Sequence, residues 1–411
     1  MTYIRYFATN RDRENLGRDV SRRDRLKMQK GGYNWIDTTA YMSYYLAETN
    51  PDRMPKEALI TSSQQPIFDD FLGKLSVKRV IICIHGFNVP LHGALTSFTV
   101  LADTLKATGR FGDDPDDSDL IVDPTTEEAK AKLANPENKL TAVVGFSWPS
   151  NGSVLDYGSD RTEAATSAPV LANLISAIRH QKAKTEKIET EIFVVAHSMG
   201  NFLTCTMLHD LAEEKYTPLF NEGTQQERLK FRGDKDIAHP KFFIEGYFML
   251  APDVERRHVT KCYKVPPKTG FKSDPYRAED FSKEALTQPQ SLDNEIENLY
   301  YLGPFFEGLH HLVGGTYLFY SRHDQALKTS RIEKEVRERS DDLKELLTGR
   351  NMDNLWEDSL GLNPVPPLAP PNMYSINSST CADMAIDHGN YFDVMGIAQK
   401  IAQKILEYRA A

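Results

Sequence analysis

The sequence contains no long apolar run and little cysteine. No stretch of the 411 residues approaches the roughly eighteen uninterrupted apolar side chains of a membrane-spanning helix, so we expect no membrane span. The four cysteines lie far apart and form no C-x-x-C pair, which argues against a zinc or dithiol motif. Cys83 and Cys205 fall in apolar segments, where cysteine acts as a small core residue. The N-terminus lacks the pattern of a secretory signal, so we expect a cytoplasmic protein.

Clustered basic charge and metal-binding motifs are also lacking. The formal net charge is -9 and no stripe of Lys and Arg dominates any segment, which argues against a nucleic-acid partner. The acidic segment 113–119 lacks the glycine and the terminal glutamate of an EF-hand loop, and it is predicted to be a solvated turn. The adjacent His310 and His311 have no H-E-x-x-H helix around them. We therefore expect neither a metal nor another cofactor, and the oligomeric state stays open.

Short apolar runs alternate with helical patterns along the chain. The runs, rich in Val, Ile, Phe and Tyr, predict strands at residues 3–7, 34–42, 79–85, 140–148, 191–197, 242–250, 316–321 and 373–377. Spacings of three and four between apolar residues predict helices at 93–108, 162–179, 201–214, 331–347 and 393–408. This alternation predicts an α/β fold with a doubly wound, mostly parallel sheet and helices on both faces.

Two stretches interrupt the alternation. Residues 255–312 are rich in Lys, Asp, Tyr and Pro and have little periodicity, and we expect them to form a lid or cap insertion. Residues 349–372 end in a proline-rich run that is predicted to be a stiff, extended connector. Because α/β proteins often keep one core and place their excess length in insertions, we expect residues 1–411 to form a single domain.

The stretch Ala196-His197-Ser198-Met199-Gly200 is the most informative motif in the chain. A predicted buried strand precedes it and a predicted helix follows it. A serine on a sharp turn between strand and helix, with small residues two positions before and after it, is typical of a nucleophile elbow. Alanine replaces the usual first glycine here and is small enough for the same turn. We therefore predict Ser198 as a nucleophile.

A serine nucleophile needs an imidazole base, and the imidazole needs a carboxylate that fixes its tautomer. His388, the last histidine, follows the last predicted strand and precedes the terminal helix, which is the position expected for the base. Asp324 and Asp253 each follow a predicted strand and are both candidates for the acid. We favour Asp324 because its strand comes directly before the strand that leads to the histidine, and Asp253 stays the alternative.

Two backbone N–H groups are needed to stabilise an oxyanion. Met199, directly after the nucleophile, supplies one, and Phe87, after the strand that ends in His85-Gly86, is predicted to supply the other. Glycine at position 86 permits a close approach of backbone and substrate. We expect His85 to organise this loop and Phe87 and Trp148 to line an apolar pocket. The full set of side chains predicted to contact or border the substrate is His85, Trp148, His197 and Asp253.

Several stretches together resemble a bacterial α/β-hydrolase group of unknown function within the α/β-hydrolase superfamily. They are residues 6–11 (YFATNR), 85–88 (HGFN), 146–150 (FSWPS), 196–201 (AHSMGN) and 251–253 (APD), with Tyr157, Asp160 and Arg161 between them. The superfamily likeness runs from about residue 79 to residue 408. The resemblance implies an α/β-hydrolase fold and a serine hydrolase, and it implies little about the substrate. Residues 255–312 and 349–372 are long for that group.

These observations favour a serine hydrolase that cleaves small carboxylic esters of short or medium acyl chain through an acyl-enzyme. The same three side chains would also serve a thioesterase or an acyltransferase, and nothing in the pocket residues excludes a peptidase. A different class, a binding or scaffold protein on a hydrolase fold, would require a damaged set of catalytic residues. A metal-dependent hydrolase would require clustered His and carboxylate ligands around residues such as His310 and His311.

Overall fold

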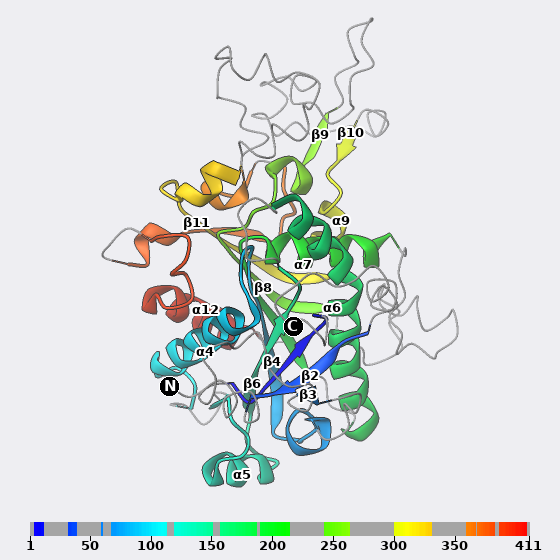
Figure 1. Ribbon diagram of the computed structural model, residues 1–411, viewed down its shortest axis with the longest axis vertical. Helices are drawn as coiled ribbons and strands as arrows, with labels where there is room; N and C mark the ends of the chain where they lie inside the picture. The colour runs from blue at the N-terminus through cyan, green and yellow to red at the C-terminus, as the bar shows by residue number, and fades with distance from the viewer. Residues whose placement is uncertain are drawn as a thin grey trace, which may run out of the picture.

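A computed structural model describes most of the chain, namely residues 4–11, 32–38, 59–60, 67–112, 119–150, 157–186, 190–213, 242–263, 300–330, 359–366, 368–382 and 386–408. Its main feature is a large ten-stranded sheet (Figure 1). The strands of this sheet are β1 (Tyr6–Thr9), β2 (Asn34–Asp37), β3 (Leu59–Ile60), β4 (Val77–Ile84), β5 (Asp119–Ile121), β6 (Leu140–Ser147), β7 (Glu191–His197), β8 (Ile244–Leu250), β11 (Val313–Tyr320) and β12 (Met373–Asn377).

The sheet is mostly parallel. Its strand order is β12-β11-β8-β7-β4-β6-β1-β2-β3, with β5 beside the first half of β6. Only β2 and β3, at one edge, run antiparallel to their neighbours. The central strands β4, β6, β7 and β8 are almost continuous runs of buried apolar side chains, because helices cover both faces of the sheet.

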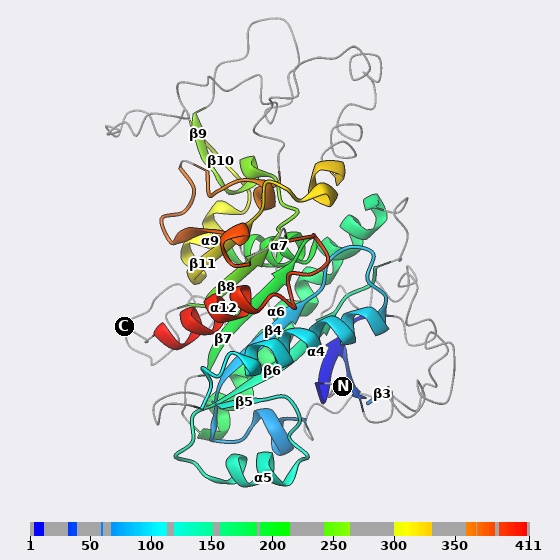
Figure 2. The same ribbon diagram turned by 90° about the vertical axis from the view of Figure 1, so that its left-hand side faces the viewer.

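Helices pack on both faces of the sheet, as the alternation of apolar runs and helical patterns predicts. Helices α4 (Leu91–Ala107) and α12 (Met395–Glu407) lie side by side on one face, and α6 (Tyr157–Glu186) and α7 (Gly200–Ala212) on the other (Figures 1 and 2). Two apolar clusters fill the space between the sheet and these helix pairs. Cys83 and Cys205 belong to these clusters, as expected.

Several short elements were not predicted. They are α5 (Glu127–Ala134), α9 (Phe306–His311), β3, β5, a π-helix (Phe68–Leu72) and 3-10 helices at Arg256–Val259, Leu360–Leu362 and Ser378–Thr380. Helix α5 buries only Ala129 and Leu133, so its sequence carries almost no apolar periodicity. Its only strong local signal is Thr126, whose side chain accepts a hydrogen bond from the Ala129 N–H at the start of the helix.

The two predicted insertions are described in part. Residues 255–263 and 300–312 are the described ends of the first, and they pair as antiparallel strands β9 (Lys261–Tyr263) and β10 (Tyr300–Leu302) beyond one end of the large sheet (Figure 1). In the second, the side chain of Asn372 donates hydrogen bonds to the carbonyl groups of Leu309 and Val313, which fixes the entry to β12. The predicted helix at 331–347 and the part of the predicted strand at 39–42 lie outside the described residues.

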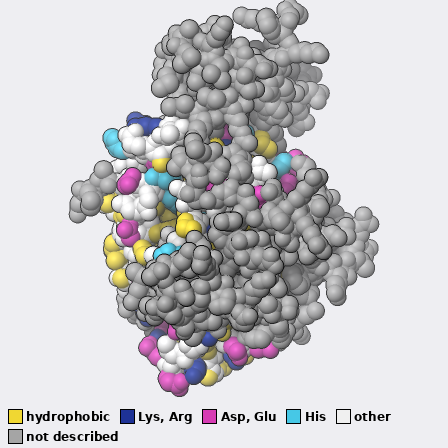
Figure 3. Space-filling view, viewed as in Figure 1, with side chains coloured by type: hydrophobic (Ala, Val, Ile, Leu, Met, Phe, Trp, Pro, Cys, Tyr) yellow, Lys and Arg dark blue, Asp and Glu magenta, His cyan; other side chains and the backbone are white. Residues whose placement is uncertain are grey.

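On the face drawn in Figure 3, the described side chains show no single dominant charge. In Figure 3 the lower end of the molecule, over α5, carries acidic and basic side chains side by side. One example is the contact of Lys132 with Asp119 and Glu128. Among the helices that the structure describes, none combines the length and the apolar character needed to cross a membrane.

Candidate active site

Ser198 occupies the sharp turn between β7 and α7. Its φ angle is 50°, in the left-handed region that non-glycine residues rarely adopt, which is the strained backbone of a nucleophile elbow. The turn is held from the neighbouring strand, because the Ser198 N–H donates to the carbonyl of Leu250 at 2.9 Å and the Asp253 N–H donates to the Ser198 carbonyl at 3.2 Å. The end of β8 therefore fixes the position of the serine.

Small residues around the turn allow two backbones to approach closely. A Cβ atom on Gly200 would lie 2.5 Å from the His85 carbonyl oxygen, and one on Gly86 would lie 2.7 Å from the Cβ atom of Ser198. Ala196, where a glycine is usual, is fully buried. Gly86 and Gly200 are thus required because the loop after β4 passes directly against the elbow.

Replacing Gly200 by alanine is expected to lower the free energy of unfolding by about 1–3 kcal/mol, because the new methyl group meets a backbone oxygen that has no room to retreat. Urea unfolding of the two proteins measures the difference. Gly389→Ala is the matched control, because no atom lies within 4 Å of a Cβ atom built there. Equal losses in the two variants would show that steric crowding at the elbow is not the cause.

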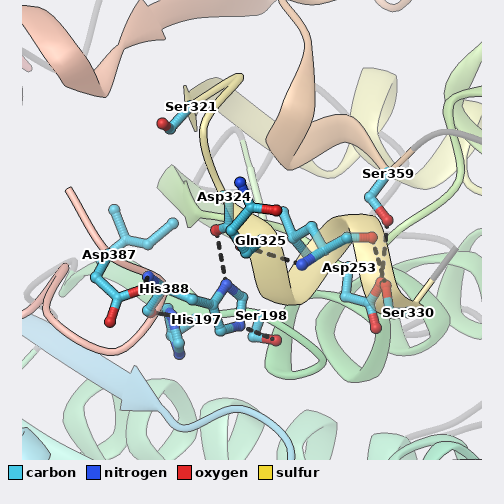
Figure 4. Close-up of polar contacts among 12 residues, drawn as sticks. His197, Ser198, Asp253, Ser321, Asp324, Gln325, Ser330, Ser359, Asp387 and His388 are labelled. Atoms are coloured by element: carbon cyan, nitrogen blue, oxygen red, sulfur yellow. Dashed lines mark hydrogen bonds and ion pairs between the residues drawn. The ribbon is translucent and has the colours of Figure 1, made fainter. Parts of the chain in front are cut away.

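His388 lies between Ser198 and Asp324, and the three side chains form one chain of hydrogen bonds (Figure 4). The Ser198 hydroxyl lies 2.9 Å from Nε2 of His388, and Nδ1 of His388 lies 2.7 Å from Oδ2 of Asp324. A carboxylate accepts a hydrogen bond from Nδ1–H, which leaves Nε2 as the acceptor for the serine O–H. His388 lies 190 residues after Ser198 and 64 residues after Asp324 in the sequence, so only the fold brings the three together.

Asp324 is held rigidly in this arrangement. Its side chain is 0% exposed, and its second oxygen accepts a hydrogen bond from the Leu327 N–H at 3.0 Å. Residues 325–330 form a helical turn that begins directly after it. A carboxylate at the start of a helix is stabilised by the free N–H groups there. The side chain of His388, by contrast, is 20% exposed.

Asp253, the alternative acid, lies away from His388. Its Oδ2 accepts a hydrogen bond from the Tyr157 hydroxyl at 2.6 Å, and its Oδ1 accepts hydrogen bonds from Ser330 at 3.0 Å and Ser359 at 3.1 Å (Figure 4). The side chain is buried and its acceptors are occupied. Its described partners are thus hydroxyl groups of the protein, and its contact with a substrate stays a prediction.

The ring of His197 contacts the loop that carries the base. Its Nε2–H donates to the His388 carbonyl oxygen at 2.7 Å, and its ring lies against the ring of His388 at a centroid distance of 4.8 Å. Burial, together with the neighbouring His388, lowers the pKa of His197 to about 3. The neutral His197 therefore holds the base loop, although the sequence placed it at the substrate.

His85 is fixed in one neutral tautomer. Its Nδ1–H donates to the Gly86 carbonyl at 2.8 Å, while its Nε2 accepts from the Trp148 N–H at 3.2 Å. Burial and the nearby Arg11 guanidinium lower the pKa of His85 well below its ordinary value. The ring organises the loop after β4, as expected, and has no open face for a substrate.

Trp148 is fully buried as well. Its ring stacks on His85 at 5.2 Å, and its Nε1–H donates to the His85 carbonyl at 2.9 Å. The indole packs under the loop after β4, and the predicted contact of Trp148 with an acyl or alcohol group stays a prediction. Phe87 stays partly exposed, with its ring against that of Tyr157 at 5.5 Å. The apolar lining expected from two aromatic rings is reduced to Phe87.

The backbone N–H groups of Phe87 and Met199 lie on the two turns that flank Ser198. Met199 directly precedes α7, and Phe87 follows Gly86, whose backbone approaches the Ser198 side chain. Within the described residues, neither N–H group donates a hydrogen bond to a protein acceptor. Both are thus available to an oxygen atom bound beside Ser198.

A second polar cluster lies behind the elbow and was not predicted. Arg161 forms an ion pair with Glu255 at 2.6 Å, and its guanidinium lies over the ring of Phe202 at 4.1 Å. Burial, and then the charge of Asp253, raises the pKa of Tyr157 well above its ordinary value. From the sequence, Tyr157 and Arg161 were noted only among the residues that carry the family resemblance. Their contacts could not be predicted, because buried polar pairs leave no periodic pattern.

No group of three or more His, Cys, Asp or Glu side chains that could hold a metal ion occurs in the described part of the chain. His310 and His311 lie in and at the end of α9, where His311 contacts Glu307 at 2.9 Å.

Comparison with known proteins agrees with this architecture. The family model described as alpha/beta hydrolase of unknown function (DUF900) matches residues 60–380. An uncharacterized protein of Nostoc sp. (strain PCC 7120), alr1448, is 46% identical over 405 residues, which cover 98% of this chain and 94% of that protein.

A structural likeness to lipase B of Aspergillus fumigatus covers 85% of this chain and 69% of that one, with 12% identity and a TM-score of 0.26. These values are too low to compare individual residues. The family match and the mostly parallel sheet between two helical layers confirm the predicted α/β-hydrolase fold. The chain therefore belongs to the DUF900 family of alpha/beta hydrolases of unknown function.

Proposed function

We propose that this protein is a serine hydrolase that cleaves carboxylic esters of short or medium acyl chain through an acyl-enzyme. The observation that carries the proposal is the continuous hydrogen-bonded path from the Ser198 hydroxyl through His388 to Asp324. Three residues from distant parts of the chain meet with the distances that a nucleophile, its base and an orienting acid require.

The first step is attack of the Ser198 oxygen on the ester carbonyl carbon. As the new C–O bond forms, the hydroxyl proton moves to Nε2 of His388, which lies 2.9 Å away. The imidazolium that results is stabilised by the buried carboxylate of Asp324 on Nδ1. His388 then gives the same proton to the departing alkoxide, so that the alcohol leaves neutral and the acyl group stays on Ser198.

Stabilisation of the oxyanion comes from the backbone. The N–H groups of Phe87 and Met199 flank the carbonyl carbon bound to Ser198, and the N-terminus of α7 adds the positive end of its dipole. Preorganised donors of this kind stabilise charge in the transition state, because they need no rearrangement when it forms.

Water completes the reaction in a second step that uses the same side chains. His388 takes a proton from a water molecule, the hydroxide attacks the acyl carbon, and the proton returns to the Ser198 oxygen as the carboxylic acid leaves. No cofactor takes part in any step of this scheme.

Residues 255–312 are proposed as a cap over this site. The insertion begins at Glu255, close to Asp253, whose N–H group contacts the Ser198 carbonyl. Its first residue also contacts helix α6, since Glu255 pairs with Arg161, and the two described ends of the insertion contact each other, since His258 packs against Phe305 at 5.3 Å.

Labelling with a fluorophosphonate probe tests the proposal, because the probe reacts only with an activated serine. We expect one label per chain, located on the peptide that contains Ser198, together with hydrolysis of a short p-nitrophenyl ester. Prior reaction with the probe should abolish that hydrolysis. A chain that neither labels nor turns over ester would instead fit a binding or scaffold protein on the same fold.

A further inference from the structure

Arg11, at the end of the N-terminal strand β1, is a fully buried arginine close to the loop after β4. It lies outside residues 60–380, which match the family model. Its side chain lies between the segments that carry His85 and Trp148, with contacts to His85 and to Ser147, the residue before Trp148. A buried guanidinium requires well-placed acceptors, because its desolvation is costly.

The guanidinium contacts both ends of the loop 85–89, which we call the oxyanion loop. Nη2 donates to the Val89 carbonyl at 2.7 Å and lies 3.3 Å from Nε2 of His85. Nε donates to the Ser147 hydroxyl at 2.9 Å, and Nη1 donates to the Ser150 carbonyl at 3.5 Å. One side chain therefore joins the start and the end of the oxyanion loop to the segment after β6.

The oxyanion loop depends on such anchoring. Asn88 has a φ angle of 57°, so the loop contains a strained residue directly after Phe87. Ser150 adds a second anchor, since its hydroxyl accepts from the Val89 N–H at 3.3 Å and donates to the buried carboxylate of Asp160. Phe87 lies between two points that Arg11 holds in place.

We propose that Arg11 is a positioning residue for the oxyanion hole: by fixing His85 and Val89 together, it holds the Phe87 N–H group where the oxyanion forms. This inference rests on the proposed function, because the oxyanion exists only if Ser198 attacks a carbonyl. The planar guanidinium donates in several fixed directions at once, which a lysine ammonium on a flexible stem does not reproduce.

The role predicts a particular kinetic signature. A misplaced N–H donor weakens binding of the transition state and leaves binding of the ground-state ester unchanged. Misplacement of a catalytic group by about 1 Å costs about 10²-fold in rate. Arg11 variants should therefore lose kcat while KM stays nearly constant.

The test compares Arg11→Lys and Arg11→Met with the wild type, with kcat calculated per active site from the end point of fluorophosphonate titration. We expect kcat per site to fall about 10- to 10²-fold in both variants, with KM changed by less than about twofold. Affinity for a boronic acid, which forms a tetrahedral adduct with the serine, should fall by the same factor as kcat.

Arg179→Lys is the matched control. Arg179 is also a buried arginine, but it binds Glu245 and the carbonyl groups of Thr190 and Phe243 at the opposite ends of the strands. This variant should lower stability and leave kcat per site unchanged. The inference is wrong if Arg11 variants likewise lose only stability or titratable sites while turnover and boronate affinity per site stay at the wild-type level.

Ser147→Ala covers the case in which neither Arg11 variant folds. It removes the acceptor of Arg11 Nε and leaves the charge in place, so a smaller loss of kcat per site, again with constant KM, is expected. An unchanged kcat in this variant contradicts the inference. Failure of the proposed function looks different, since the wild type itself would then show neither labelling nor turnover.

Discussion

Replacing Ser198 by alanine is expected to lower kcat for a short p-nitrophenyl ester by about 10³-fold or more, and to abolish fluorophosphonate labelling. Alanine removes the only atom that attacks the carbonyl carbon and leaves the elbow, the base and the two N–H donors in place. The remaining rate would come from binding and from the oxyanion hole alone. Steady-state kinetics of the purified variant, with its folding checked by circular dichroism, measures the loss.

Ser330→Ala provides the control for this prediction. Ser330 is a buried serine close to the same site, but its hydroxyl donates to Asp253 and not to the base. Because this hydroxyl does not contact His388, its loss should change kcat by only a few-fold. Loss of its hydrogen bond to the Asp253 carboxylate should mainly lower the free energy of unfolding. Wild-type activity in Ser198→Ala would remove Ser198 from the mechanism and end the proposal of an acyl-enzyme.

Replacing Asp324 by asparagine is expected to lower kcat by about 10⁴-fold, as amide replacement of the acid does in other serine hydrolases. An amide NH₂ in place of Oδ2 would donate toward Nδ1 of His388, and the imidazole would change tautomer to accept it. Nε2 would then carry the proton and lose its ability to take one from Ser198. Steady-state kinetics with the same ester measures the loss.

The variant Asp253→Asn tests which of the two aspartates is the acid, because the sequence alone left both Asp324 and Asp253 as candidates. Asp253 binds Tyr157, Ser330 and Ser359, so an amide there should reduce the free energy of unfolding and leave kcat within a few-fold of the wild type. Comparable losses of kcat in Asp253→Asn and Asp324→Asn would mean that the hydrogen bond between Asp324 and His388 is not the one that orients the base.

The order and type of the main elements could be predicted because the central strands are buried on both faces. Apolar runs of Val, Ile and Phe therefore mark β4, β6 and β7 with few errors at their ends. The start of β11 was placed three residues late, at 316 and not Val313, because Gly314 and Gly315 interrupt the run. Gly314 is required there, since a Cβ atom would lie 2.6 Å from the Glu245 carbonyl oxygen.

In the candidate site, too, some features could be predicted from the sequence and others could not. Each of the three candidate catalytic residues follows a strand, and their order along the chain is a known one. Position in the sequence was therefore enough to predict Ser198, Asp324 and His388 as a set. The direction of a side chain carries no such signal. Trp148 follows β6 just as a pocket residue would, yet its ring turns inward and stacks on His85. Arg11 and Tyr157 form buried hydrogen bonds near the site, and such bonds leave no periodic pattern in the sequence.

The hydrogen bond from the His197 ring to the His388 carbonyl oxygen also ties the loop that carries His388 to the large sheet. His197 is the last residue of β7 and directly precedes Ser198, so the peptide that bears His388 is tied to an interior strand of the sheet. Any excursion of residues 386–392 must first break a 2.7 Å contact at that strand. The position of His388 between Ser198 and Asp324 is therefore supported by a contact of its own backbone to the sheet, in addition to the two side-chain contacts of its ring.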